Sequence, residues 1–136
     1  MRMTYRLCTT IAATLFSLPL PAHADGIAKP TPVLREIVDA MPTGPRQEVR
    51  VITATFKPGD RTVTHTHRFP VTVYVLEGAF TLELEGRKPI VVEAGRSLVE
   101  PPLVKMTGYN RSATQTTKVV IFYVSDVDTP FLDLHH

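Results

Sequence analysis

Two sets of regularly spaced residues between positions 59 and 110 constrain the fold more than any other feature of this chain. The first set is, in order, Gly59, His65, His67, Val71 and Gly78. The second set is Gly95, Pro101, Pro102, Leu103, Met106 and Asn110. Glycine and proline mark turns, and the segments between them are rich in β-branched and aromatic residues. The two sets therefore predict short β-strands joined by turns.

The rest of the chain continues this pattern. Between 79 and 85 apolar and polar residues alternate, which places Phe80, Leu82 and Leu84 on the inward face of a strand. The longest apolar run, 118–124, predicts a strand buried on both sides. Turns recurring roughly every 8 to 12 residues favour an antiparallel sandwich or barrel. In all, we predict strands at 49–56, 63–67, 71–76, 79–85, 90–93, 97–99 and 118–124.

Residues 1–24 are expected to form a secretory signal peptide. Arg2 and Arg6 precede an apolar stretch at 7–20, and small residues at 22–24 fit a cleavage site before Asp25. A membrane anchor is the alternative, but the stretch is short and is interrupted by Pro19. We therefore expect an exported protein, periplasmic or extracellular.

The mature chain would have 136 − 24 = 112 residues, which suits one domain. Its only cysteine, Cys8, would leave with the leader, so disulfides cannot stabilise it. Losing Arg2 and Arg6 reduces 15 basic residues to 13, equal to the 13 acidic ones. This balance and the absence of a basic run argue against nucleic acid as a partner. No mature segment is long and apolar enough to predict a membrane span.

The spacing of the two sets resembles the two signature motifs of the cupin superfamily. The resemblance implies an all-β fold, an antiparallel double-stranded β-helix, or jelly roll, of two facing sheets. It also favours an extended segment over a helix at 33–41, where apolar residues fall at helical spacing between prolines. We expect a leader at 1–24, an extended arm at 25–32, the barrel at 33–128 and a C-terminal tail at 129–136, whose last two residues, His135 and His136, are expected to be solvated. Many cupins are exchanged-strand dimers, so a homodimer formed through the arm is expected.

The resemblance also implies a metal site whose ligands are partly missing here. In the family, the position of Val71 is usually a glutamate, that of Leu103 a glycine and that of Met106 a histidine. This glutamate and this histidine bind the metal together with the two histidines that correspond to His65 and His67. His65 and His67 are two residues apart, so a strand projects both from one face as a bidentate pair. The expected site comprises metal ligands His65, His67 and Met106, with Val71 and Val73 lining the pocket.

The ion expected at this site is a single divalent or copper ion. The thioether of Met106 is a soft ligand suited to copper. The alternative, which we favour, is that Met106 fills the apolar interior, as most methionines do. Glu100, just before the two prolines, is expected to be an ordinary surface residue near the barrel mouth.

Three functions stay open at this point. The first is an exported cupin that binds a metal ion, a small apolar ligand, or both, through the two histidines. The second is a metal-dependent dioxygenase, isomerase or lyase of the kind the family contains. The third is a structural or assembly role in which the histidines are remnants, since one barrel fold hosts unrelated functions.

Overall fold

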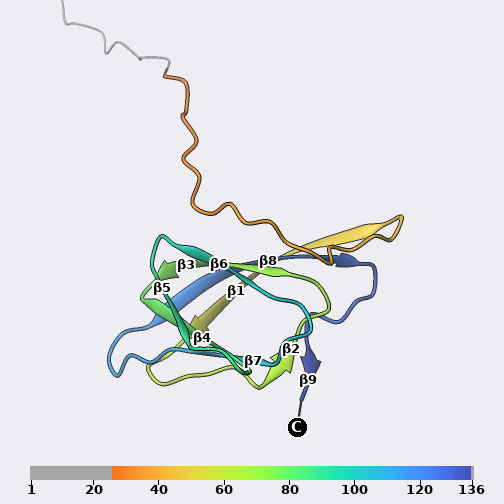
Figure 1. The fold of residues 1–136 in the computed structure, drawn as a ribbon. Helices are drawn as coiled ribbons and strands as arrows, with labels where there is room; N and C mark the ends of the chain where they lie inside the picture. Colours follow the sequence, from red (N-terminus) through yellow and green to blue (C-terminus); the bar gives the residue numbers. More distant parts are fainter. Residues whose placement is uncertain (1–25, 136) are drawn as a thin grey trace, which may run out of the picture. The chain divides into compact units, whose positions relative to one another are not determined.

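The computed structural model describes residues 26–135, so the predicted leader and His136 lie outside the described residues. Within the described residues there are nine β-strands and no helix, hence no helix that could cross a membrane (Figure 1). The strands are β1 (Gln47–Phe56), β2 (His65–Thr66), β3 (Val71–Glu77), β4 (Ala79–Leu84), β5 (Ile90–Glu93), β6 (Ser97–Glu100), β7 (Met106–Tyr109), β8 (Thr117–Asp126) and β9 (Asp133–Leu134).

The strands form two antiparallel sheets that face each other (Figure 1). One sheet has the order β1-β8-β3-β6, and the other has the order β5-β4-β7-β2-β9. β4 and β5 form a hairpin, but the other neighbouring strands in each sheet are not consecutive in the chain, as expected when the chain crosses from one sheet to the other. This arrangement confirms the predicted all-β jelly roll.

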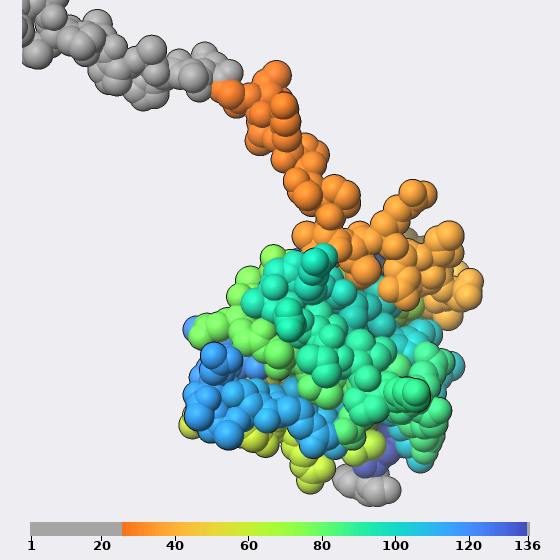
Figure 2. All heavy atoms as spheres, turned by 60° about the vertical axis from the view of Figure 1, so that its left-hand side comes forward, coloured from red at the N-terminus to blue at the C-terminus, as the bar shows by residue number. Residues whose placement is uncertain are grey.

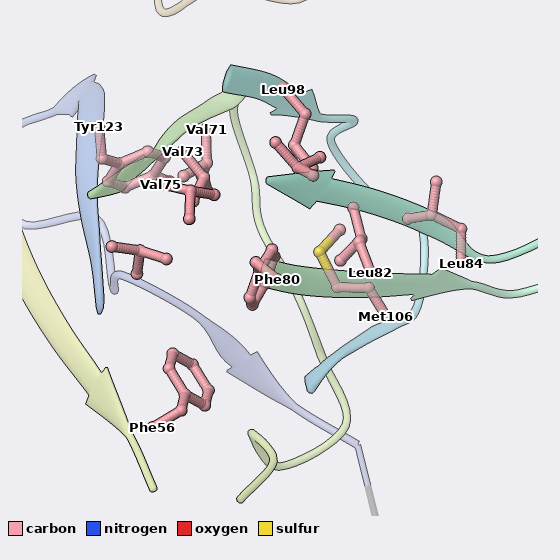
Figure 3. Packing of buried hydrophobic residues seen from close by; sticks show 12 residues of the cluster. Phe56, Val71, Val73, Val75, Phe80, Leu82, Leu84, Leu98, Met106 and Tyr123 are labelled. Atoms are coloured by element: carbon pink, nitrogen blue, oxygen red, sulfur yellow. The ribbon is translucent and has the colours of Figure 1, made fainter. Parts of the chain in front are cut away.

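The core lies between the two sheets. Its residues are the inward-facing members of the alternating strands, and Phe80, Leu82 and Leu84 are all buried, as the pattern at 79–85 predicts (Figure 3). The longest antiparallel pair is β1 with β8, in which Gln47 lies opposite Asp126 and Phe56 opposite Thr117. This pair forms one wall of the barrel.

The prediction that β8 is buried on both sides is wrong. Val119 and Tyr123 face the core and are buried, but Phe122 between them is 44% exposed. On the partner strand, Val49 and Val51 are likewise exposed. The apolar run therefore has one face in the core and one face on the outside of the sheet, where no second layer covers all of it.

Residues 31–46 lie outside the two sheets. They form no strand, and Ile37 is almost fully exposed. Atoms of this segment lie against the outside of the barrel (Figure 2). Leu34 and Met41 line a groove of about 310 Å³ together with outer-face residues such as Phe122. The segment at 33–41 is thus neither a helix nor a sheet strand.

The C-terminal tail that we expected from residue 129 packs on the barrel, although His135 is exposed. Asp133–Leu134 forms β9, in which Leu134 pairs with His65 and Asp133 with Thr66 of β2. The His135 ring lies 3.1 Å from the Thr66 hydroxyl. We call residues 129–135 the strap. It packs on the barrel because β2 presents a free edge with which its backbone can pair.

Asn110, the final residue of the second motif, supports a turn. Asn110 is buried, and its side-chain amide donates hydrogen bonds to the carbonyl oxygens of Phe56, Lys57 and Gln115. One side chain therefore joins the end of β1 to the loop before β8.

Candidate functional site

The two motif histidines meet inside the barrel. His65 is 5% exposed and His67 is 1% exposed. Their Nε2 atoms are 3.1 Å apart, and the rings meet edge to face with centroids 4.7 Å apart. His65 in β2 and His67 directly after it therefore both project into the interior, as the spacing of two residues predicts.

The other nitrogen of each ring is held by the backbone. His65 Nδ1 lies 2.7 Å from the carbonyl oxygen of Val63, and His67 Nδ1 lies 2.6 Å from that of Phe131. A carbonyl oxygen only accepts hydrogen bonds, so each Nδ1 donates its hydrogen. In a neutral ring, each Nε2 then carries a lone pair, and the two lone pairs face one another.

A carboxylate that we expected on the surface completes the cluster. Glu100 at the end of β6 is only 6% exposed, and its Oε2 lies 3.1 Å from His67 Nε2. Glu100 is directly opposite Val71 in the pairing of β6 with β3. The carboxylate therefore comes from the strand beside the position at which the family usually has one.

We expected Glu100 on the surface, although the spacing of residues in β6 carries a signal for its burial. Leu98 and Glu100 are two residues apart in β6, so an inward Leu98 implies an inward Glu100. The sequence shows neither the direction of Leu98 nor the pairing of β6 with β3, because strand register is a long-range property.

A cavity of about 60 Å³ adjoins the cluster. Its polar side is formed mainly by His65, His67 and Glu100, and most of its other walls are apolar. The apolar and small lining residues are Phe56, Val73, Phe80, Gly108, Val119, Ile121, Phe131 and Leu132. Four larger grooves lie on the outside of the described part of the barrel, and their linings do not bring together several buried ionisable side chains. This cavity is therefore the candidate site.

The other predicted site residues have different positions. Val73 lines the cavity, whereas Val71 is buried in the core and is not part of the cavity wall. Met106 is 2% exposed, lies opposite Leu84 on the neighbouring strand and belongs to the apolar cluster (Figure 3). It does not line the cavity, a position that suits packing better than metal binding.

The donor atoms can be compared with the needs of a metal ion. Among residues 26–135, no three His, Cys, Asp or Glu side chains are grouped as a metal site. The available donors are the imidazoles of His65 and His67 and the adjacent carboxylate of Glu100. When both rings are neutral, no hydrogen lies between the two Nε2 atoms. Burial lowers the pKa of His65, and the Val63 carbonyl opposes this effect. A neutral His65 keeps its lone pair available, so the pair fits a cation bound through two protein nitrogens.

Comparison with solved structures places this barrel among known folds. The chain is similar to a cupin-like protein from Thermotoga maritima (18% identity, TM-score 0.57, 64% of each chain covered). It is also similar to the DMSP lyase DddQ from Ruegeria pomeroyi (16% identity, TM-score 0.55, 63% of this chain and 42% of that one). A third neighbour is the polyketide cyclase RemF from Streptomyces resistomycificus (21% identity, TM-score 0.53, 65% and 61%). The chain spans less than two-thirds of each of these three, and the likeness shows the fold alone.

Sequence comparison gives the family. A comparison with curated proteins finds no match. The family profile described as "Cupin domain" matches residues 52–123, which is more than half of the chain and includes both motifs. The two-sheet barrel, the motif spacing and this match agree, and the chain belongs to the cupin family.

Proposed function

We propose that this protein binds one transition-metal ion inside the barrel through the Nε2 atoms of His65 and His67. The observation that carries the proposal is the 3.1 Å approach of these two atoms while both Nδ1 atoms donate to carbonyl oxygens. Two facing lone pairs in a buried site repel each other unless a proton or a cation lies between them. A bound cation removes this repulsion.

The donor set favours a particular class of ion. Imidazole suits zinc, copper, nickel and iron, whereas magnesium and calcium prefer oxygen ligands. Glu100 supplies negative charge next to His67, which offsets part of the charge of a divalent ion. With two protein nitrogens as ligands, the ion would keep positions for water or a small ligand.

The size of the cavity limits that ligand. A buried water needs roughly 10–15 Å³ of such space, so a cavity of about 60 Å³ holds an ion with a few waters or a molecule of a few atoms. Sites for larger organic ligands measure several hundred Å³. The apolar walls favour a ligand with an apolar part.

A metal-dependent reaction is the second candidate, and Glu100 is the observation that favours it. A buried carboxylate beside the two imidazoles is placed to accept or return a proton during catalysis. Two of the similar structures are named as a lyase and a cyclase, so this fold accommodates enzymes. With its predicted leader, the protein would act outside the cytoplasm.

The proposal is tested by metal content and titration of untagged protein purified without chelators. We expect about one zinc or copper ion per chain. His65→Ala and His67→Ala should each weaken binding by at least about 100-fold, since even residues behind the ligands contribute about 10- to 100-fold.

Met106→Leu is the matched control and should bind like the wild type, because Met106 does not line the cavity. The proposal fails if the wild type binds none of these ions, or if the two histidine variants bind them as tightly as the wild type.

A further inference from the structure

We propose that the strap, residues 129–135, is the gate of the His65–His67 site and also holds His67 in its binding orientation. The proposal rests on the metal binding proposed above and extends it to how the ion enters and leaves.

The strap covers the cavity. Phe131 and Leu132 form part of the cavity wall. The Phe131 ring packs against His67, with centroids 5.0 Å apart, and against Tyr123, with centroids 5.6 Å apart. Because both histidines are at most 5% exposed, an ion reaches them only when some covering element moves.

The strap also touches a proposed ligand directly. The carbonyl oxygen of Phe131 accepts the hydrogen of His67 Nδ1 at 2.6 Å. Such a partner fixes the tautomer and the direction of a metal-binding imidazole. His65 Nδ1 donates its equivalent bond to the carbonyl oxygen of Val63, so of the two Nδ1 atoms only that of His67 is bonded to the strap. Docking of the strap and binding at His67 are therefore coupled.

The far part of the strap is held by a few peripheral interactions. Arg68 forms two hydrogen bonds with Asp133, at 3.0 and 3.1 Å, and both side chains are more than one-third exposed. The β9 strand has two residues, and His135 adds a backbone bond to Thr64. Exposed ion pairs contribute little, and short peripheral elements open before the whole fold does.

The near part of the strap is anchored more firmly. Arg50 donates a 2.7 Å hydrogen bond to the carbonyl oxygen of Thr129, and the Thr129 amide donates to Asp126. Between them, Asp128 has a φ of 63°, an unusual value for a residue other than glycine. The strap is therefore a hinged segment. Its base at Thr129 is anchored, the turn at Asp128 precedes it, and its far part is weakly held.

The test measures how fast Zn²⁺ enters the full chain and leaves it to an excess of chelator. Asp133→Asn and Arg68→Gln each remove the exposed ion pair. The rates of Zn²⁺ entry and of Zn²⁺ release should both rise by about 2- to 5-fold, the range expected for loss of a surface ion pair. Because the two rates rise together, Kd should change less than either rate. The double variant should behave like either single variant, because one interaction is lost.

Glu83→Gln, which removes the exposed ion pair with Arg111, is the matched control and should leave both rates unchanged.

A second variant locks the strap with a disulfide. Thr66 and Asp133 are opposite each other, and Cys8 is the only natural cysteine. Oxidised Thr66→Cys/Asp133→Cys should release Zn²⁺ more slowly than the wild type, and the Thr66→Ser/Asp133→Ser control should release it faster. Wild-type rates in both ion-pair variants would overturn the gate.

Failure of the gate can be told apart from failure of metal binding. If the wild type binds no ion, the proposed function fails and the gate is judged by hydrogen exchange alone. Amides of residues 132–135 should then exchange faster in Asp133→Asn while those of β8 keep their protection. Equal exchange of the strap in the wild type and this variant would overturn the gate independently.

Discussion

At the residue scale, Gly78 shows why a motif glycine is required. Its φ is 73°, and a Cβ added there would lie 2.5 Å from the carbonyl oxygen of Thr116. Gly86 has the same φ, but a Cβ there meets nothing within 4 Å. Gly86→Ala should cost about 1–2 kcal/mol for the left-handed backbone alone. Gly78→Ala should cost at least about 1 kcal/mol more because of the clash.

Urea unfolding of the two alanine variants measures this difference directly. Equal losses of stability would show that Thr116 moves aside without cost, and that only the backbone conformation matters at Gly78.

Also at the residue scale, the side-chain direction of the two histidines was predictable and that of Glu100 was not. Strand parity is a local rule, so the spacing of His65 and His67 is enough to place both on one face. Glu100 is buried because β6 pairs with β3 and brings it opposite Val71. Nothing within a few residues of Glu100 specifies that pairing.

At the element scale, attachment of the strap should depend on pH. The hydrogen bonds from Arg68 lower the pKa of Asp133 from its ordinary value of 3.8. A carboxyl group whose pKa is lowered by folding stabilises the folded form above its unfolded pKa. That contribution is lost as the pH falls through the lowered value. Opening of the strap should therefore increase as the pH falls below about 4.

Hydrogen exchange of the strap amides, corrected for intrinsic rates, follows this opening between pH 5 and 3. In Arg68→Gln, Asp133 loses its hydrogen-bond partner. The strap of this variant should therefore already be as open at pH 5 as the wild-type strap is at pH 3. A wild-type strap whose opening is constant over this range would contradict the prediction.

At the scale of the whole molecule, stability should come from one face of each sheet. Val119 is 1% exposed and Val51 is 62% exposed, although both belong to the paired strands β1 and β8. Val119→Ala should cost about 2 kcal/mol, from two lost methyl groups and the cavity they leave. Val51→Ala should cost less than about 0.5 kcal/mol.

Thermal or urea unfolding of these two variants compares the same chemical change at both positions. A similar loss at Val51 would contradict the prediction and would mean that the outer face is covered in solution.

The amino-acid sequence by itself determined most of the strands, many of the turns and the interior position of the histidine pair, but it did not predict β7 or β9. These properties depend on patterns within about ten residues: alternation, turn residues and the spacing of the two motifs. The run at 118–124 marks the limit of this reasoning. Its composition predicts a strand, but whether Phe122 is covered depends on what lies against the sheet.

Only the tertiary structure decided which groups complete the site. Glu100 joins His67 through the pairing of β6 with β3, and Phe131 joins it from a segment 64 residues away. Both contacts depend on how distant segments pair, and this is set by the packing of the whole barrel. The sequence therefore predicted two histidines facing the interior, and the fold added the carboxylate and the strap that surround them.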